Sequence, residues 1–261
     1  MIDHMPSWAA AGFRSDSFLA RASRPILNRI VPEGQTVVII RSGPGKGLSL
    51  PIMPETEKYY WSGTHERHVQ DAIVDLLNEG MCFWDIGAHI GFISIIAARQ
   101  VGESGTVVAF EPMPESRARL TESIRLNGFT NVIVKDYALG DTNETRMLHP
   151  PRLDESDAKG TDSRGSTLMW TLDSDRGDND GISVDCRRID DLVGEIEPPD
   201  LIKVDAEGVE IEVLAGGVKQ LARGGTKVIV EMSDAETLER GRSLLPDYRF
   251  DLIGANHWLL S

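Results

Sequence analysis

The sequence lacks several features that would assign it to particular classes of protein. No stretch approaches the roughly 18 consecutive apolar residues of a membrane-spanning helix. Residues 1–11 lack the basic start and apolar core of a secretory signal peptide, so we expect a cytoplasmic protein. Cysteine is scarce, because Cys82 and Cys186 are the only two, and two cysteines make neither a disulfide framework nor a metal site.

Basic charge is also in short supply. The 261 residues carry a formal net charge of −14, whereas binding to a nucleic-acid backbone needs a basic surface, so we expect no nucleic-acid partner. Arg117, Arg119 and Arg125 fall on one expected helix, where a solvated face is the simpler interpretation. The hydrophobic fraction of 41% and charged fraction of 26% are ordinary for a soluble globular protein.

From residue 81 onward, β patterns and helical patterns alternate along the chain. Such alternation predicts a parallel sheet with helices on both faces. The expected strands are 81–86, 106–110, 131–135, 201–204 and 227–230. The expected helices are 92–101, 114–126, 209–222 and 235–245. An antiparallel pair, 248–253 with 257–260, would close the chain.

Two regions fall outside this alternation. We assign residues 1–62 to an N-terminal extension, with a helix over 13–30 and a hairpin of 37–40 with 48–53, which could contact substrate or a second subunit. A helix over 64–78, with Thr64 as its N-cap, would open the main domain, residues 63–261. The acidic stretch 141–181 is long for a loop, so we expect a lid-like insertion in which 145–148 and 182–187 pair.

The most informative segment is a strand that runs into a glycine turn, Phe83-Trp84-Asp85-Ile86-Gly87-Ala88-His89-Ile90-Gly91. A dinucleotide-binding turn has its first glycine where this chain has Asp85, and there a pyrophosphate meets a helix N-terminus. A carboxylate would repel that phosphate but suits a cofactor with ammonium or sulfonium groups. The motif therefore indicates S-adenosylmethionine (SAM) and methyl transfer.

Acids also follow each of the other expected parallel strands, at Glu111, Asp136, Asp205 and Glu231. Ligands of an open α/β sheet bind beyond the carboxyl ends of its strands, so these acids predict an acidic site there. An acid after a strand is often only the cap of the next helix, which leaves both interpretations open for each acid alone. The spacing of Asp85 and Glu111 together favours the functional interpretation.

Each position can be given a role. Asp85 and the backbone of Gly87, Ala88, His89 and Gly91 would hold the amino-acid end of SAM, because glycine lets the chain approach a ligand closely. Glu111, about twenty residues after the turn, would accept the ribose hydroxyls, with Pro112 fixing the backbone. Asp136, Tyr137 and Ala138 are placed to contact the adenine, and Asp205 to lie beside the methyl group.

The segment Lys203-Val204-Asp205-Ala206-Glu207-Gly208-Val209-Glu210 concentrates charge at one strand end. Asp205 or Glu207 could be the general base, and oxygen ligation of a divalent cation is an alternative that we do not favour. An ion-pair cluster capping the next helix is the simplest reading. His89 could be a second base or a structural turn residue. Glu66 could contact the cofactor or merely place a favourable charge at a helix start.

At these residues the chain resembles the FkbM-type family of SAM-dependent methyltransferases. The likeness rests on Asp85–Gly91, Phe110-Glu111-Pro112, and Ile202–Glu210 with Val213-Leu214-Ala215-Gly216, and is supported by Gly63-Thr64-His65-Glu66, Ala138-Leu139-Gly140 and Val230-Glu231. It covers about residues 63–233. It departs at His89, where the family usually has asparagine.

The resemblance implies a class I methyltransferase fold, a Rossmann-like doubly wound α/β fold whose seven-stranded sheet has an antiparallel last strand. It implies methylation of a hydroxyl on a sugar, glycolipid or secondary metabolite. Asp85, Gly87 and Glu111 become cofactor contacts, and Asp205 and Glu207 flank the reaction centre.

We therefore expect a SAM-dependent O-methyltransferase acting on a small hydroxylated acceptor. Three alternatives stay open: a methyltransferase for protein or nucleic acid, a non-catalytic SAM-binding module, and a nicotinamide-dependent dehydrogenase. Asp85 and the absence of a Tyr-x-x-x-Lys pair speak against the dehydrogenase. The sequence leaves the acceptor open, and it also leaves room for a homo-oligomer.

Overall fold

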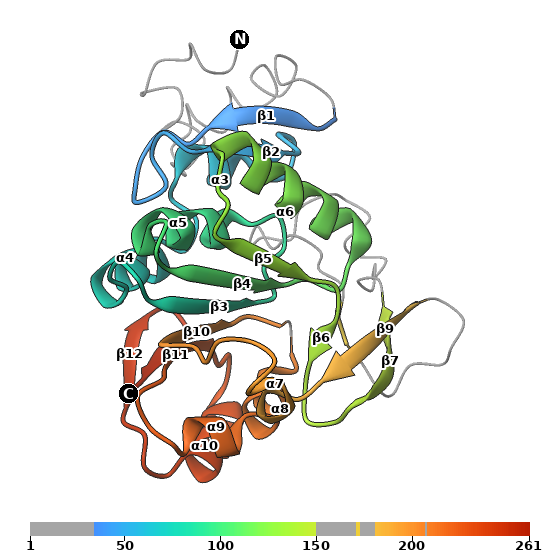
Figure 1. Ribbon diagram of the computed structural model, residues 1–261, viewed down its shortest axis with the longest axis vertical. Helices are drawn as coiled ribbons and strands as arrows, with labels where there is room; N and C mark the ends of the chain where they lie inside the picture. Colours follow the sequence, from blue (N-terminus) through green and yellow to red (C-terminus); the bar gives the residue numbers. More distant parts are fainter. Residues whose placement is uncertain (1–33, 150–170, 173–180, 207) are drawn as a thin grey trace, which may run out of the picture.

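The computed structural model describes residues 34–149, 171–172, 181–206 and 208–261. The helix expected over 13–30, candidate base Glu207 and much of the expected insertion lie outside these residues. The main body is a seven-stranded sheet of order β12-β13-β11-β10-β3-β4-β5 (Figure 1). Its strands are β3 (Cys82–Ile86), β4 (Thr106–Phe110), β5 (Val132–Lys135), β10 (Leu201–Val204), β11 (Lys227–Glu231), β12 (Phe250–Gly254) and β13 (His257–Leu260).

Neighbouring strands from β5 to β11 are parallel, and β13 is antiparallel to both β11 and β12. The expected doubly wound sheet with an antiparallel last strand is therefore confirmed. The chain winds outward in one direction from β3 to β5 and returns to place β10 on the other side of β3. Ligands of open α/β sheets bind at such a reversal of strand order, beyond the carboxyl ends.

Alternate residues of each strand supply two separate hydrophobic cores. Phe83, Leu201 and Ile229 join one core with the helices α4 and α5, and their neighbours Trp84 and Ile202 join the other. Because successive side chains of a strand point to opposite faces, both faces must be covered by helices. In Figure 1, α4, α5 and α6 lie on one side of the sheet and α8, α9 and α10 on the other.

The helices mostly match the expected ranges, with two corrections. Helix α4 begins at Arg67, later than expected, because Glu66 has left-handed backbone angles and no side chain caps the helix. The helix expected over 209–222 is two short helices broken at Gly216. A Cβ there would lie 1.9 Å from the carbonyl oxygen of Gly140, so this close approach needs glycine. The helices are α3 (Lys58–Ser62), α4 (Arg67–Leu76), α5 (Phe92–Val101), α6 (Pro114–Asn127), α7 (Ile189–Leu192), α8 (Glu210–Ala215), α9 (Val218–Leu221) and α10 (Ala235–Leu244).

The expected hairpin forms from β1 (Thr36–Ile39) and β2 (Ser49–Ile52), which pair antiparallel. Its side chains Val38 and Leu50 are buried in the same core as α4 and α5. A buried ion pair between Glu57 and Arg119 of α6 adds a second connection. The described part of the N-terminal region thus shares a core with the main domain.

The expected pairing around the acidic insertion also forms. The strands β6 (Ala138–Leu139), β7 (Glu144–His149), β8 (Thr171–Leu172) and β9 (Ile182–Arg187) make a separate four-stranded sheet of order β6-β9-β7-β8. We call it the added sheet. Since β6 follows β5 closely, the added sheet projects from the carboxyl-end side of the main sheet (Figure 1).

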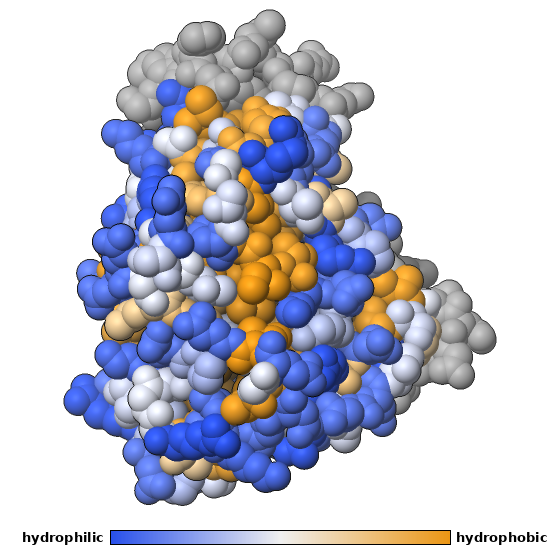
Figure 2. Space-filling model, in the orientation of Figure 1, coloured by the Kyte–Doolittle hydropathy of each residue, from blue (hydrophilic) through white to orange (hydrophobic). Residues whose placement is uncertain are grey.

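The surface carries an apolar band on one face, visible in Figure 2. Val37, Ile39 and Ile133 are among the large hydrophobic side chains that are exposed, and Ile133 belongs to the edge strand β5. Both cysteines are buried and unbridged, as expected. No helix in the described part of the chain is long and apolar enough to cross a bilayer.

Candidate active site

Strand register gathers charged side chains at the carboxyl ends of the central strands. Lys203 is paired with Asp85 across β10 and β3, and Glu231 is paired with His257 across β11 and β13. Asp85, Lys203 and Glu231 come two residues after Phe83, Leu201 and Ile229 on the same strands. Because side chains two apart on a strand point to the same face, they lie on the face that α4 and α5 cover. One edge of the sheet thus collects residues that are far apart in the sequence.

The glycine turn is pressed against this edge. A Cβ on Gly87 would lie 1.8 Å from the carbonyl oxygen of Asp205, and one on Gly91 would lie 2.5 Å from Leu120. Both glycines have positive φ, which other residues rarely adopt. The two glycines are therefore needed for close contacts within the protein, whereas the sequence suggested a close approach to the ligand.

Four backbone N–H groups of the turn already donate within the protein. The N–H groups of Gly87 and Ala88 both donate to the carbonyl of Phe110, and that of Gly91 donates to the carbonyl of Ala88. The His89 N–H donates to Glu111 (2.7 Å). A bound phosphate would have to compete with these bonds, so the turn is poorly suited to a pyrophosphate.

Asp85 lies inside β3 and not beyond its end, and its side chain is 0% exposed. Its Oδ2 accepts a hydrogen bond from the Ser94 hydroxyl (2.5 Å). Its Oδ1 has no partner among the described residues, although a buried oxygen normally has one. Burial raises the pKa of Asp85, and Lys203 and the Ser94 hydrogen bond oppose the rise.

Glu111 is a second buried acid, and it organises two loops. Its carboxylate accepts the N–H groups of His89 (2.7 Å) and Met113 (2.8 Å). Burial raises its pKa to about 7, against the effect of these hydrogen bonds. His89 has left-handed backbone angles, and its Nδ1 lies 3.2 Å from the hydroxyl oxygen of Tyr60. Burial lowers the pKa of His89 to about 4, so its ring is neutral at physiological pH.

The Lys203 ammonium is the buried cation of the cluster. It donates to Asp205 (2.8 Å). Burial by itself would lower the pKa of Lys203, but the nearby Asp205, Asp85 and Glu66 outweigh burial and hold this pKa above its usual value. Burial by itself would raise the pKa of Asp205, but the ion pair with Lys203 outweighs burial and lowers it. A carboxylate held in its ionised form is a weak base, so this geometry favours an electrostatic role for Asp205.

Glu66 lies opposite this pair, at the start of α4. Burial raises its pKa to about 7, with further contributions from Asp205, Glu231 and Asp85 and an opposing one from Lys203. Its φ of 42° is one of three positive values among the described non-glycine residues, the others being at His89 and Ala255. Strained backbone of this kind often marks functional sites.

Three histidines lie at this site, His257, His68 and His65, and none of them was predicted from the sequence as a site residue. His257 is the first residue of β13. Because β13 runs antiparallel to β11, the beginning of β13 lies at the carboxyl end of the parallel strands. Its Nε2 lies 4.0 Å from Glu66 Oε1, and its Nδ1 lies 3.0 Å from Nε2 of His68. His65 Nε2 lies 3.4 Å from Glu66. The only sequence signal was the closing hairpin, whose register places His257 beside Glu231.

The remaining predicted contacts are spread around the edge. Pro112 accepts a hydrogen bond at its carbonyl from Arg117. Tyr137 packs beside Phe110, with the Arg187 guanidinium over its ring, and Ala138 is buried in the added sheet. Asp136 is exposed after β5.

The loop that follows Asp205 is fastened by Glu210. Its carboxylate accepts hydrogen bonds from the N–H groups of Ala206 and Gly208. Within the described residues, no three histidine, cysteine or acidic side chains are grouped so that they could hold a metal.

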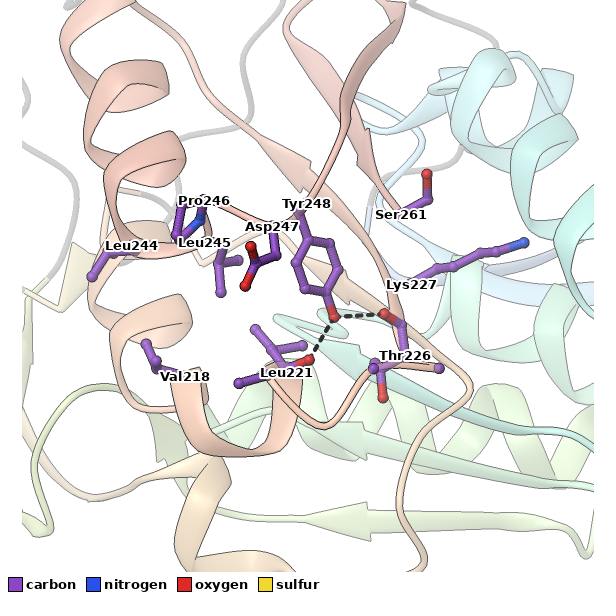
Figure 3. A pocket seen from close by; sticks show the side chains of 13 residues that line it. Val218, Leu221, Thr226, Lys227, Leu244, Leu245, Pro246, Asp247, Tyr248 and Ser261 are labelled. Atoms are coloured by element: carbon purple, nitrogen blue, oxygen red, sulfur yellow. Dashed lines mark hydrogen bonds between the residues drawn. The ribbon is translucent and has the colours of Figure 1, made fainter.

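A cavity of about 290 Å³ lies at the opposite end of the strands (Figure 3). Lys227, the first residue of β11, and Ser261, which follows β13, both line it. Tyr248 fixes its wall by donating to the carbonyl oxygens of Leu221 and Thr226. The cavity is therefore separate from the charged edge.

The charged edge and the sheet topology can be compared with known proteins. A family model described as the methyltransferase FkbM domain matches residues 85–252, from the glycine turn into β12. The chain belongs to the FkbM methyltransferase family. It is a methyltransferase, as the sequence predicted.

The chain is also similar to curated methyltransferases whose names state a substrate or a position. The hexuronic acid methyltransferase AglP of Haloferax volcanii is 32% identical over 192 residues, which is 71% of each chain. The 2-O-methyltransferase NoeI of Sinorhizobium fredii is 33% identical over 152 residues, 54% of this chain and 58% of NoeI. The solved FkbM methyltransferase of Methylobacillus flagellatus is 18% identical with a TM-score of 0.48, covering 71% of this chain and 44% of that one.

Proposed function

We propose that this FkbM methyltransferase uses SAM to methylate a hydroxyl group of a sugar-like acceptor. The observation that carries the proposal is the charge of the site. Four N–H groups of the turn that would meet the cofactor, those of Gly87, Ala88, His89 and Gly91, are bonded within the protein, and acidic side chains lie around the turn at Asp85, Glu111 and Asp205. Such a site suits a cationic cofactor without phosphate.

The residues present fit SAM in a second respect. The orphaned Oδ1 of Asp85 is a buried acceptor that a ligand or an ordered water would satisfy. Asp85 and the turn Gly87–Gly91 would hold the amino-acid end. Glu111 keeps free lone pairs for ribose hydroxyls after accepting two N–H groups, and Asp136 with Tyr137 would border the adenine.

When bound, SAM supplies a methyl group activated by a sulfonium charge. The chain contributes position and charge. Lys203 keeps Asp205 ionised, and the Asp205 carboxylate would offset positive charge near the methyl group. Holding acceptor and donor in attack geometry would supply most of the acceleration.

The acceptor class follows from the relatives. AglP is named as acting on a hexuronic acid, and NoeI is named as a 2-O-methyltransferase. We extend O-methylation of a sugar-like hydroxyl to this chain. Methylation of a protein or nucleic acid is the alternative, and the net charge of −14 disfavours the nucleic acid.

The test has two stages. S-adenosylhomocysteine at about a hundred times its Kd should stabilise the protein by about 2.7 kcal/mol, whereas NAD⁺ should not. Transfer of a radiolabelled methyl group is then measured with 4-nitrophenyl β-D-glucuronide and 4-nitrophenyl β-D-glucopyranoside, which differ only at C6, and with total cell protein and RNA. Label in a glycoside supports the proposal. Stabilisation by NAD⁺ alone, or label only in protein or RNA, contradicts it.

A further inference from the structure

We infer that Glu66 takes the proton from the acceptor hydroxyl and that His257 and His68 carry this proton to solvent. We call these three residues the proton path. The inference rests on the proposed function, because transfer to a hydroxyl leaves a proton in the site. It gives Glu66 a role other than the cofactor contact or helix-start charge that the sequence suggested, and it adds His257 and His68, which lie outside the matched residues 85–252.

The proton balance defines what the site must do. The acceptor oxygen forms a bond to the methyl carbon, the carbon–sulfur bond breaks, and its electron pair stays on sulfur. The hydroxyl proton must then leave the oxygen. Asp205 is held ionised by Lys203, whereas Glu66 titrates near neutral pH, which suits a base.

The contacts of Glu66 point to His257. The Glu66 Oε1 atom lies 4.0 Å from Nε2 of His257, and this nitrogen has no hydrogen-bond partner among the described residues. His257 is 4% exposed, so an unpaired ring nitrogen there is costly and calls for a function. A small movement of the Glu66 side chain would bring the two groups within hydrogen-bond reach.

His68 completes the path to the surface. Its Nε2 lies 3.0 Å from Nδ1 of His257, and its ring is partly exposed on α4. A Cβ on Gly254 would lie 2.6 Å from the ring of His68, so glycine at the end of β12 leaves the space that the ring fills. The two rings are therefore held in contact by both α4 and the closing hairpin.

The transfer balances along this path. Glu66 gives its proton to Nε2 of His257, while the Nδ1 proton of His257 passes to Nε2 of His68 and His68 releases its Nδ1 proton to water. Between turnovers each ring returns to its starting tautomer by losing the Nε2 proton and gaining one at Nδ1 in exchange with water. Burial and Lys203 lower the pKa of His257 to about 4, so the ring is neutral between turnovers and releases its Nδ1 proton as it accepts one at Nε2.

The charges facing the path set its pH dependence. Glu66 faces Lys203 and Asp205 at the end of β10, Glu231 of β11, Asp85 of β3 and the neighbouring His65. His257 faces Lys203, Asp205 and His68, and His68 faces Asp71 on its own helix. Because Glu66 must be ionised to accept a proton, turnover should rise with pH through about 7.

The experiment compares kcat, KM and S-adenosylhomocysteine affinity in three variants, with whichever glycoside the wild type methylates. Glu66→Gln should lower kcat roughly 100-fold, and His68→Gln, which keeps a polar atom near the Nε2 position, roughly 10-fold. Affinity for S-adenosylhomocysteine should change less than about twofold in both. In His68→Ala, imidazole in the buffer should restore kcat, because a small base can replace the exposed ring. His149→Gln, a buried histidine of β7 away from this edge, is the matched control with an unchanged pH profile.

A second readout needs no turnover. In the free protein, ¹⁵N NMR of labelled histidines should show His257 neutral at pH 7 with its proton on Nδ1, and His68→Gln should shift its resonances. An unchanged kcat in His68→Gln, or a loss that imidazole does not restore, overturns the path and leaves the histidine pair structural. A wild type that methylates no acceptor overturns the proposed function itself, and the path with it.

Discussion

Gly87→Ala tests the central contact of the site. In the structure the turn at Gly87 meets the end of β10, and a Cβ would lie 1.8 Å from the carbonyl oxygen of Asp205. That atom belongs to the backbone, so a side-chain rotation cannot relieve the clash. The φ of 80° at Gly87 adds a further cost for any residue with a Cβ.

The magnitude can be worked from these two contributions. Left-handed backbone costs an alanine roughly 1–2 kcal/mol, and forcing extra volume into a filled space costs typically about 1–3 kcal/mol. Together they predict a loss of roughly 2–5 kcal/mol. For a domain of this size that is a fall in Tm of roughly 4–15 °C. The added methyl group should also push the glycine turn away from Asp205, and this displacement should weaken the binding of S-adenosylhomocysteine.

The control isolates the clash from the backbone strain. Gly128 ends α6 with a φ of 69°, and no heavy atom lies within 4 Å of the position of its Cβ. Gly128→Ala should therefore lose only the backbone contribution and keep full affinity. Thermal unfolding and calorimetric titration with S-adenosylhomocysteine measure both effects. Equal losses of Tm in Gly87→Ala and Gly128→Ala would refute the close approach on which the site is built.

Three further predictions concern buried charges. The pKa of Glu66 is about 7 in the folded protein against 4.5 for a free side chain, so the ionised form of Glu66 lowers the free energy of unfolding. This loss of stability is absent below pH 4.5 and complete above pH 7, where it amounts to up to about 3 kcal/mol. Glu66→Gln should therefore raise Tm at pH 8 and leave it unchanged at pH 4, and a lower Tm at pH 8 would contradict the burial of its charge. Lys203→Met leaves Asp205 without its partner and should lower the free energy of unfolding in urea by about 3–5 kcal/mol at pH 8. The loss should be smaller at pH 5, and an equal loss at both pH values would argue against the ion pair. Arg119→Met leaves the buried Glu57 carboxylate without its partner and should lower the free energy of unfolding by about 3 kcal/mol. Arg125 forms an exposed ion pair with Glu122 on the same helix, so Arg125→Met should lower it by less than about 1 kcal/mol. Similar losses in the two variants would show that the first pair is not buried.

Much of the architecture could be read from local pattern. Apolar strands and amphipathic helices recur with short connections, so the limits of β4 and the start of α6 are those the sequence predicts. The close approach of Gly216 to the carbonyl of Gly140 could not be found in this way. That carbonyl belongs to another part of the chain, and a long-range contact leaves no periodic signal.

The candidate site divides in the same way. The glycine turn and the acids after each strand are local features, and the sequence by itself determined the family and the acidic edge from them. Only the tertiary structure decided that Asp85 is buried and that Asp205 is held by Lys203. It also decided that His257, 191 positions after Glu66 in the numbering, faces it. The reason is physical: burial and strand register follow from how the whole sheet assembles, and pKa values follow from burial.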